Sequence, residues 1–153
     1  MKFSLLFLII LVFFINGCSS TKIKDKRDYA TYFNQKYIKM LDFQGHDLVA
    51  TNVNNQWYYV RKDGKAMPVM SDDRGSADKF KEGLARTKIN GKIGFFNRDL
   101  DMVIEPFYDF AFPFHKGISD ICVGCKEVKD ENIKMLDGGD WKRINRSGLI
   151  IEE

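Results

Sequence analysis

Short apolar runs separated by turn residues dominate the chain from residue 46 onward. The clearest example lies in residues 80–117, where one apolar run leads into Asn90-Gly91, a second leaves it, and a third follows the turn at 97–101. Asn-Gly between two apolar runs is the strongest short signal of a β-hairpin, because both turn residues adopt a positive φ. The pattern therefore predicts three consecutive antiparallel strands in this stretch.

This pattern occurs three times along the chain. Phe80-Lys-Glu-Gly83-Leu84 is matched by Phe114-His-Lys-Gly117-Ile118, and Asn90-Gly91 has counterparts in Asn54-Asn55 and Gly138-Gly139. Repeats of roughly 20 to 50 residues form arrays in which each unit packs against its neighbours. The predicted fold is therefore mainly β, an array of about three antiparallel β-hairpin repeats. Together they form a repeat domain over 46–153, with units at about 46–79, 80–113 and 114–153.

The third unit is longer than the second. Its start follows the start of the second unit by 34 residues, but its turn follows by 48. An insertion of 14 residues therefore lies between Gly117 and Gly138. Its charged composition predicts a surface loop over Ser119–Ile133. Insertions in repeat proteins map to loops on one face, which is often the binding face.

A different apolar pattern occupies the N-terminus. Lys2 precedes Phe3–Ile15, a run of 13 residues that is apolar except for Ser4. A membrane-spanning helix needs about 20 apolar residues, whereas the apolar region of a signal peptide has the length seen here. Ile15-Asn16-Gly17-Cys18 resembles a bacterial lipobox, which implies cleavage before Cys18 and attachment of acyl chains such as palmitate to it. The alternatives are an ordinary secreted protein, with Cys18 free or in a disulfide, and an uncleaved anchor.

We accordingly expect residues 1–17 to be a lipoprotein signal peptide and residues 18–27 to be a polar tether. The protein would then be lipid-anchored in a bacterial cell envelope and would contact the membrane through the acylated Cys18. Ser19 follows the cysteine. By resemblance to lipoprotein sorting, a residue other than Asp there implies transfer to an outer membrane, if the organism has one.

Residues 28–45 show the spacing of an amphipathic helix. Apolar side chains recur three and four residues apart, at Tyr29, Tyr32, Phe33, Tyr37, Met40 and Leu41. Asp28 is a candidate N-cap and Gly45 a stop, which predicts a helix of about 13 residues. Such a helix is expected to cover the open end of the repeat array. A strip of tyrosines that binds a ligand is the alternative.

The repeat resembles the WG-repeat family over about Leu48–Glu153. The middle unit matches the family pattern best, at Phe80, Glu82, Gly83, Leu84, Ala85, Lys92, Gly94, Asn97, Val103, Ile104, Pro106, Tyr108 and Asp109. The Trp-Gly pair itself is interrupted, since Trp57 is followed by Tyr58 and Trp141 by Lys142. The resemblance implies a β-rich repeat array that mediates interactions. It carries over no catalytic residues.

Four aromatic residues alternate with other residues at the end of the second unit. Tyr108, Phe110, Phe112 and Phe114 have the period of two that predicts a strand-like segment with one aromatic face. On the surface, such a face would suit a sugar or a peptidoglycan ligand. Packed inward, it would fill the core between the second and third units, which is the commoner outcome for aromatic residues.

Cys122 and Cys125 permit three interpretations. In an oxidising envelope they would form a local disulfide, provided that Cys18 carries lipid. A thioredoxin-like redox site would need a βαβ context that the sequence does not show. A zinc site would need four ligands, with His115 as a third and either His46 or Asp120 as a fourth.

Charge and motifs limit the possible functions. The formal net charge is +3 at pH 7, which favours neither nucleic acid nor an acidic membrane as the main partner. The sequence contains no recognisable catalytic constellation and no cofactor motif. We therefore expect a non-catalytic interaction or structural module whose partner is an envelope protein or glycan. The alternatives are a thiol-active or metal-binding protein that uses Cys122 and Cys125, and an envelope glycan binder.

Overall fold

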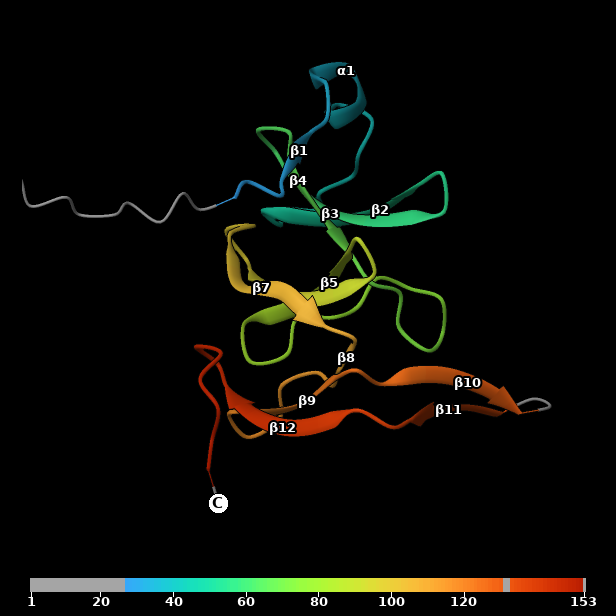
Figure 1. Cartoon of the computed structure of the whole chain (residues 1–153). Helices are drawn as coiled ribbons and strands as arrows, with labels where there is room; N and C mark the ends of the chain where they lie inside the picture. The colour runs from blue at the N-terminus through green and yellow to red at the C-terminus, as the bar shows by residue number, and fades with distance from the viewer. Residues whose placement is uncertain (1–26, 131–132, 153) are drawn as a thin grey trace, which may run out of the picture.

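In the described part of the chain, three antiparallel sheets of three or four strands follow one another and stack in that order, and a two-stranded sheet extends from the last of them (Figure 1). The computed structural model describes residues 27–130 and 133–152. The first sheet has the order β1-β4-β3-β2, the second β5-β6-β7 and the third β12-β9-β8. The bounds in the first sheet are β1 Thr31–Tyr32, β2 Leu48–Val53, β3 Gln56–Arg61 and β4 Lys65–Val69. The mainly β fold with antiparallel hairpin repeats is as predicted.

The second and third sheets complete the stack. The second contains β5 Leu84–Ile89, β6 Lys92–Asn97 and β7 Met102–Tyr108. The third contains β8 Phe110–Ala111, β9 Ile118–Val123 and β12 Asp140–Asn145, and the hairpin of β10 Lys126–Asp130 and β11 Ile133–Asp137 extends from it. Because β8 pairs with β9, the last residues of the predicted second unit belong to the third sheet.

Turn chemistry defines the first two hairpins. Asn54 and Asn55 have φ values of 51° and 65°, and Asn90 and Gly91 have φ values of 50° and 79°. Both central residues of a type I′ turn need a positive φ, and this turn matches the twist of the flanking strands. The strands therefore pair directly on either side of each turn, as the sequence predicts.

Side-chain alternation gives the facing sides of successive sheets apolar side chains, and these form a core between the sheets. In β6, Phe95 and Phe96 are both buried and point in opposite directions. Phe96 packs with Met67 and Val69 of the first sheet, and Phe95 packs with Ile121 of the third. The middle sheet therefore contributes to both interlayer cores.

The N-terminal helix is shorter than predicted. Helix α1 covers only Gln35–Ile38, and its N-cap is Asn34, whose side chain accepts a hydrogen bond from the Tyr37 backbone N–H. Residues 31–32 instead form β1 on the edge of β4. The Phe33 N–H donates to the Gly64 carbonyl at 2.9 Å, so tertiary pairing with β4 and its turn replaces the first turns of the expected helix.

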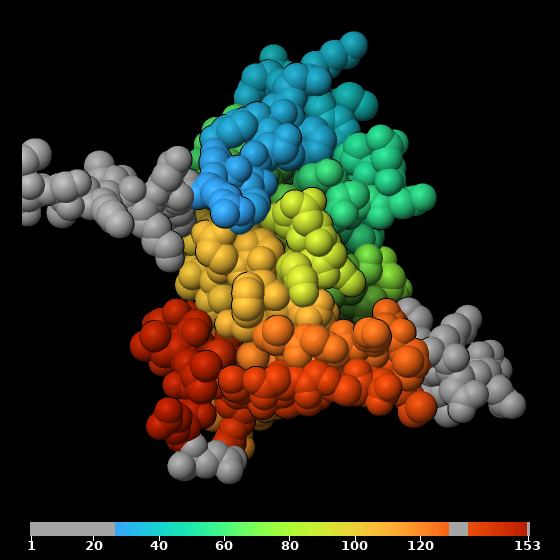
Figure 2. Space-filling view, viewed as in Figure 1, coloured from blue at the N-terminus to red at the C-terminus, as the bar shows by residue number. Residues whose placement is uncertain are grey.

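The segment around α1 still covers the first sheet. Ile38 is buried with Val60 and Ala66, and Phe33 and Leu41 pack against them. In the space-filling view, the blue N-terminal residues and the orange-to-red third unit lie at opposite ends of the molecule (Figure 2). One end of the stack is thus capped by the chain itself.

The insertion in the third unit is placed differently from the prediction. Ser119–Ile133 is not a surface loop, because β9 occupies residues 118–123 and buries Ser119, Ile121 and Cys122. Val123 pairs directly with Asp140, so residues 124–139 replace the two-residue turn of the other units. The length of the insertion agrees with the 14 residues expected from the repeat spacing. The β10–β11 hairpin lies within the inserted segment.

Candidate functional site

The face of the third sheet that points away from the second sheet has no further sheet packed on it among the described residues. We call it the terminal face. Cross-strand partners share one face of an antiparallel sheet, so the register places its members together. They are Phe110, Phe112, Asp120, Cys122, Trp141 and Arg143. Ala111, Ile121 and Ile144 alternate with them and form the core against the second sheet.

Three aromatic rings form a cluster on the terminal face. The centroids of Phe110 and Phe112 are 4.9 Å apart, and Trp141 lies 6.0 Å from Phe110 and 6.3 Å from Phe112. Phe110 and Trp141 both pair with Cys122, one from each side of β9. Phe112 is 46% exposed and Trp141 is 43% exposed, so much of this apolar area meets solvent.

The four alternating aromatics do not share one face, contrary to the prediction. Phe114 is buried and packs edge-on against Phe95 at 4.8 Å. Tyr108 packs against the same core, and its burial raises the pKa of its hydroxyl. Phe110 and Phe112 belong to the terminal face instead. Between Tyr108 and Phe110 the chain passes from the second sheet to the third, which separates Tyr108 from Phe110 and Phe112, and Phe114 follows the end of β8.

Trp141 completes the cluster, although the aromatic alternation did not point to it. The repeat alignment does contain a signal, because Trp141 stands at the position of Trp57 and Ile93. Those two residues pack toward the next sheet in the stack. At Trp141 the chain provides no such sheet among the described residues.

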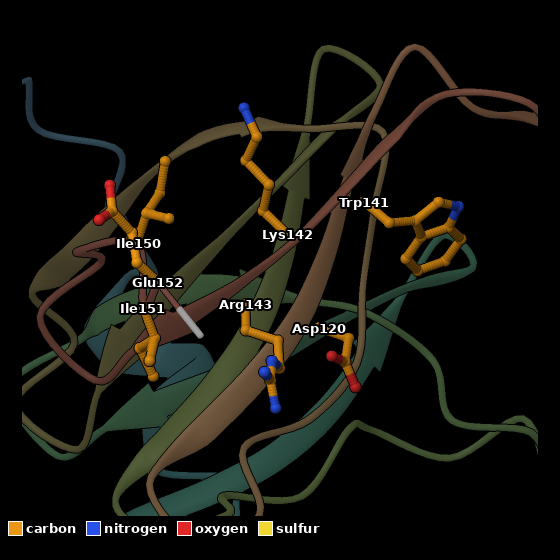
Figure 3. Close-up of a pocket in the computed structure, with 7 residues that line it drawn as sticks. All are labelled: Asp120, Trp141, Lys142, Arg143, Ile150, Ile151 and Glu152. Carbon is orange, nitrogen blue, oxygen red and sulfur yellow. The ribbon is translucent and has the colours of Figure 1, made fainter.

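An open hollow of about 560 Å³ lies beside the aromatic cluster (Figure 3). Its lining comes from β9, β12 and the residues after β12: Asp120, Trp141, Lys142, Arg143, Ile150, Ile151 and Glu152. Asp120, Arg143 and Ile151 point to one side of the sheet, whereas Lys142 and Ile150 point to the other (Figure 3). Asp120 and Arg143 are direct cross-strand partners, so opposite charges stand at the centre of the terminal face.

The two cysteines lie at the base of the insertion. Cys122 and Cys125 are joined by a disulfide, with their Cα atoms 6.1 Å apart. Cys122 is fully buried and Cys125 nearly so. A Cβ on Gly139 would lie 2.5 Å from the Cys122 sulfur, so only glycine fits there. This burial opposes a role as a thiol that reacts with external substrates.

Among the described residues, no group of three or more His, Cys, Asp or Glu side chains is arranged to hold a metal ion. His115 is exposed at the turn before β9, and His46 lines a separate hollow beside the first sheet. Neither forms such a group with the two cysteines.

Asp109 attaches the insertion to the second sheet. Its carboxylate accepts a hydrogen bond from the Gly124 backbone N–H at 2.7 Å and pairs with Lys92 of β6. The hydrogen bond from Lys92, and then the one from Gly124, hold the pKa of Asp109 below its usual value. Asp109 ends the Tyr-Asp pair of the repeat pattern, which was the signal for it in the sequence.

Residues 93–124 match the model of a family described as the WG containing repeat. The chain carries a WG repeat. The match runs from β6 to Gly124 and includes six of the eight buried residues of the core between the second and third sheets, all except Leu84 and Ile144. No curated protein and no solved structure matches the chain.

Most of the predicted N-terminal export segment lies outside the residues that the structure describes. The signal peptide, Cys18 and the tether up to residue 26 lie outside the described residues. Within the described ranges, no helix is long and apolar enough to cross a membrane.

Proposed function

We propose that this WG-repeat protein is a non-catalytic, lipid-anchored interaction module of the bacterial cell envelope, and that the terminal face is its binding surface. The observation that carries the proposal is the asymmetry of the stack. Residues 33–41 cover the outer face of the first sheet, whereas the outer face of the third sheet exposes Phe112 and Trp141.

The distribution of exposed apolar side chains supports a binding role for the third unit. Among the described residues, ten large hydrophobic side chains are exposed, and six of them lie in or beside the third unit. Of these six, Phe112 and Trp141 lie on the terminal face, and the others are Val128, Met135, Leu149 and Ile150. Apolar side chains gathered on one part of a surface mark an interaction site more often than scattered ones do.

An envelope glycan is the second candidate ligand, and the aromatic cluster favours it. Phe110, Phe112 and Trp141 offer apolar ring surface next to the opposite charges of Asp120 and Arg143, which are partners in the strand register. Co-sedimentation with purified peptidoglycan tests this alternative. If the protein binds peptidoglycan and Trp141→Ala abolishes this binding, the ligand of the terminal face is a glycan and not a protein. The terminal face would remain the binding surface.

The lipid anchor rests on the N-terminal sequence and is tested separately. In the full chain, Cys18→Ala removes the sulfur that would carry the acyl chains. The variant is expected in the soluble fraction, because several acyl chains bind a protein firmly to the membrane and the variant carries none. If the Cys18→Ala protein still requires detergent for extraction, the anchor is a different one.

Site-specific photocrosslinking in cells tests the binding surface. A benzophenone amino acid replaces Phe112 on the terminal face or, as a matched control, Phe107 on β7, which is 61% exposed. We expect a discrete crosslinked product from position 112 and none from position 107. Equal labelling at both positions, or none at position 112, would argue against the terminal face as the interaction site.

A further inference from the structure

We propose that the occupant of the terminal face is a second copy of this chain, packed face to face about a two-fold axis that runs between β9 and β12. This inference rests on the proposed function, because it names the partner of the same surface. Three features carry it: the repeat register, the order of side chains across the sheet, and the covered state of the opposite end.

The repeat register shows that the terminal face occupies a stacking position. In the first sheet, Trp57 and Tyr59 pack onto the second sheet. Ile93 and Phe95, at the same positions of the second unit, pack onto the third sheet. Trp141 and Arg143 are the corresponding residues of the third unit. The third unit therefore presents, on the terminal face, the same two strand positions that contact the next sheet in the first and second units.

The side chains across the middle of this face form a row of four. The Phe112 N–H donates to the Asp120 carbonyl at 2.9 Å, Asp120 pairs with Arg143, and the Ile151 N–H donates to the Arg143 carbonyl at 2.8 Å. The row therefore reads apolar, negative, positive, apolar. A two-fold rotation about an axis that runs along the strands, between Asp120 and Arg143, reverses this row. The reversed row of the second copy then places an opposite charge over each charge and an apolar side chain over each apolar one.

In such a pair, the Asp120 carboxylate of each copy faces the Arg143 guanidinium of the other. Phe112 of each copy then lies over Ile151 of its partner. In the neighbouring row of cross-strand partners, which contains Trp141 and Cys122, Trp141 of each copy lies over the position of Cys122 in the other copy. An isologous contact of this kind uses one patch on both copies and closes at two subunits.

A head-to-tail stack is disfavoured by the other end of the molecule. There, Ile38, Phe33 and Leu41 already cover the apolar face of the first sheet. The outer surface of this cap is mixed: Gln35, Lys36 and Lys39 are exposed there, as is Met40. Among residues 27–130 and 133–152, the other end thus offers no uncovered sheet face to match the terminal face, which favours the face-to-face pair over a head-to-tail stack.

Charge exchange tests the pair in the full chain. Chains with two different epitope tags are co-expressed, and one tag is captured from solubilised envelopes. Asp120→Arg alone and Arg143→Asp alone should each lower recovery of the second tag by about tenfold or more, since like charges then face each other. Co-expression of Asp120→Arg with Arg143→Asp should restore it, because both cross-copy contacts regain opposite charges. Asp47→Arg, whose native carboxylate is 96% exposed beside the first sheet, is the matched control.

Restoration by the mixture also shows that both variants fold. Single variants that recover the second tag like the unaltered chain would overturn the two-fold arrangement, as would a mixture that stays at the level of the single variants. The crosslinker at position 112 separates this inference from the proposed function. A product that joins two tagged copies supports the pair. A product with a different molecule, and none with both tags, overturns the pair and leaves the binding surface in place.

Discussion

Asp78 is a buried acid that binds the first strand of the second sheet. It is 4% exposed, and its carboxylate accepts hydrogen bonds from the Arg86 backbone N–H at 3.1 Å, Nε at 3.0 Å and Nη2 at 2.7 Å. Arg86 Nη1 also donates to the Ala111 carbonyl of the third sheet at 3.0 Å. One buried ion pair therefore connects the segment before β5, β5 itself and β8.

Asp78→Ala should be strongly destabilising. Removal of one partner leaves the mostly buried Arg86 without its counter-charge, which typically costs about 3–5 kcal/mol of unfolding free energy. The matched control is Asp140→Ala, which breaks the exposed pair with Lys142 and should cost under about 1 kcal/mol. Urea unfolding of both variants measures the difference. Similar losses in the two variants would mean that the buried pair contributes no more than a surface one.

Asp109 should make the stability of the domain depend on acid pH. Its folded-state pKa is lowered, first by Lys92, so its contribution is present above the unfolded pKa of about 3.9 and is lost as pH falls through the folded pKa. Asp109→Asn should therefore flatten the fall in Tm below about pH 4. Asp47→Asn, at an exposed site, serves as the control. Parallel Tm profiles for Asp109→Asn and the unaltered chain would contradict this assignment.

At the scale of elements, local signals predicted local structure. The first hairpin turns at Asn54-Asn55, as expected, and its strands are 48–53 and 56–61, because the turn residues and the flanking apolar runs determine it without distant contacts. The helix over 28–45 was wrong in extent, since β1 pairs with β4, more than 30 residues away in sequence. The spacing of apolar residues from Tyr29 to Leu41 gives no indication that β1 pairs with β4.

The candidate site was predicted in part for the same reason. Phe110 and Phe112 were named from their alternation, and the structure places both on the terminal face. Trp141 joins them only because β9 and β12 pair across residues 124–139. Long-range register, which a single sequence does not display, also overturned the predicted loop over Ser119–Ile133.

The insertion should be dispensable for folding. Val123 and Asp140 are register partners, as are Ile89 and Lys92 beside the two-residue turn of the second unit. Replacement of 124–139 by Asn-Gly, with Cys122→Ser to avoid a lone thiol, should give a third unit like the second. We expect the same β circular dichroism spectrum and a cooperative melt. Loss of both would show that the β10–β11 hairpin is needed to pair β9 with β12.

At the scale of the whole molecule, the middle sheet joins the two ends of the stack. Phe96 contributes to the core shared with the first sheet and Phe95 to the core shared with the third. Stability in repeat arrays is a sum of unit and interface terms, so a weakened central unit affects both interfaces. The two tryptophans lie in the outer units, Trp57 in the first and Trp141 in the third, and report on each end separately.

Gly91→Val should lower the melting temperature of both ends together. Gly91 has a φ of +79° and no atom within 4 Å of an added Cβ, so the cost comes from backbone strain, about 1–3 kcal/mol. Single-tryptophan variants, Trp57→Phe or Trp141→Phe, follow one end at a time by fluorescence. Coincident transitions at a lower temperature are the expected result, because each outer sheet packs on the strained one.

Gly45→Val is the matched control for this experiment. Gly45 has a φ of +80° and equal free space, but it lies in the loop after α1, outside the three sheets. Strain there should disturb the capping segment and shift the Trp141 transition less than Gly91→Val does. A Gly91→Val protein whose Trp57 and Trp141 transitions separate would show that the units unfold independently. In that case Phe95 and Phe96 would not couple the three layers into one cooperative fold.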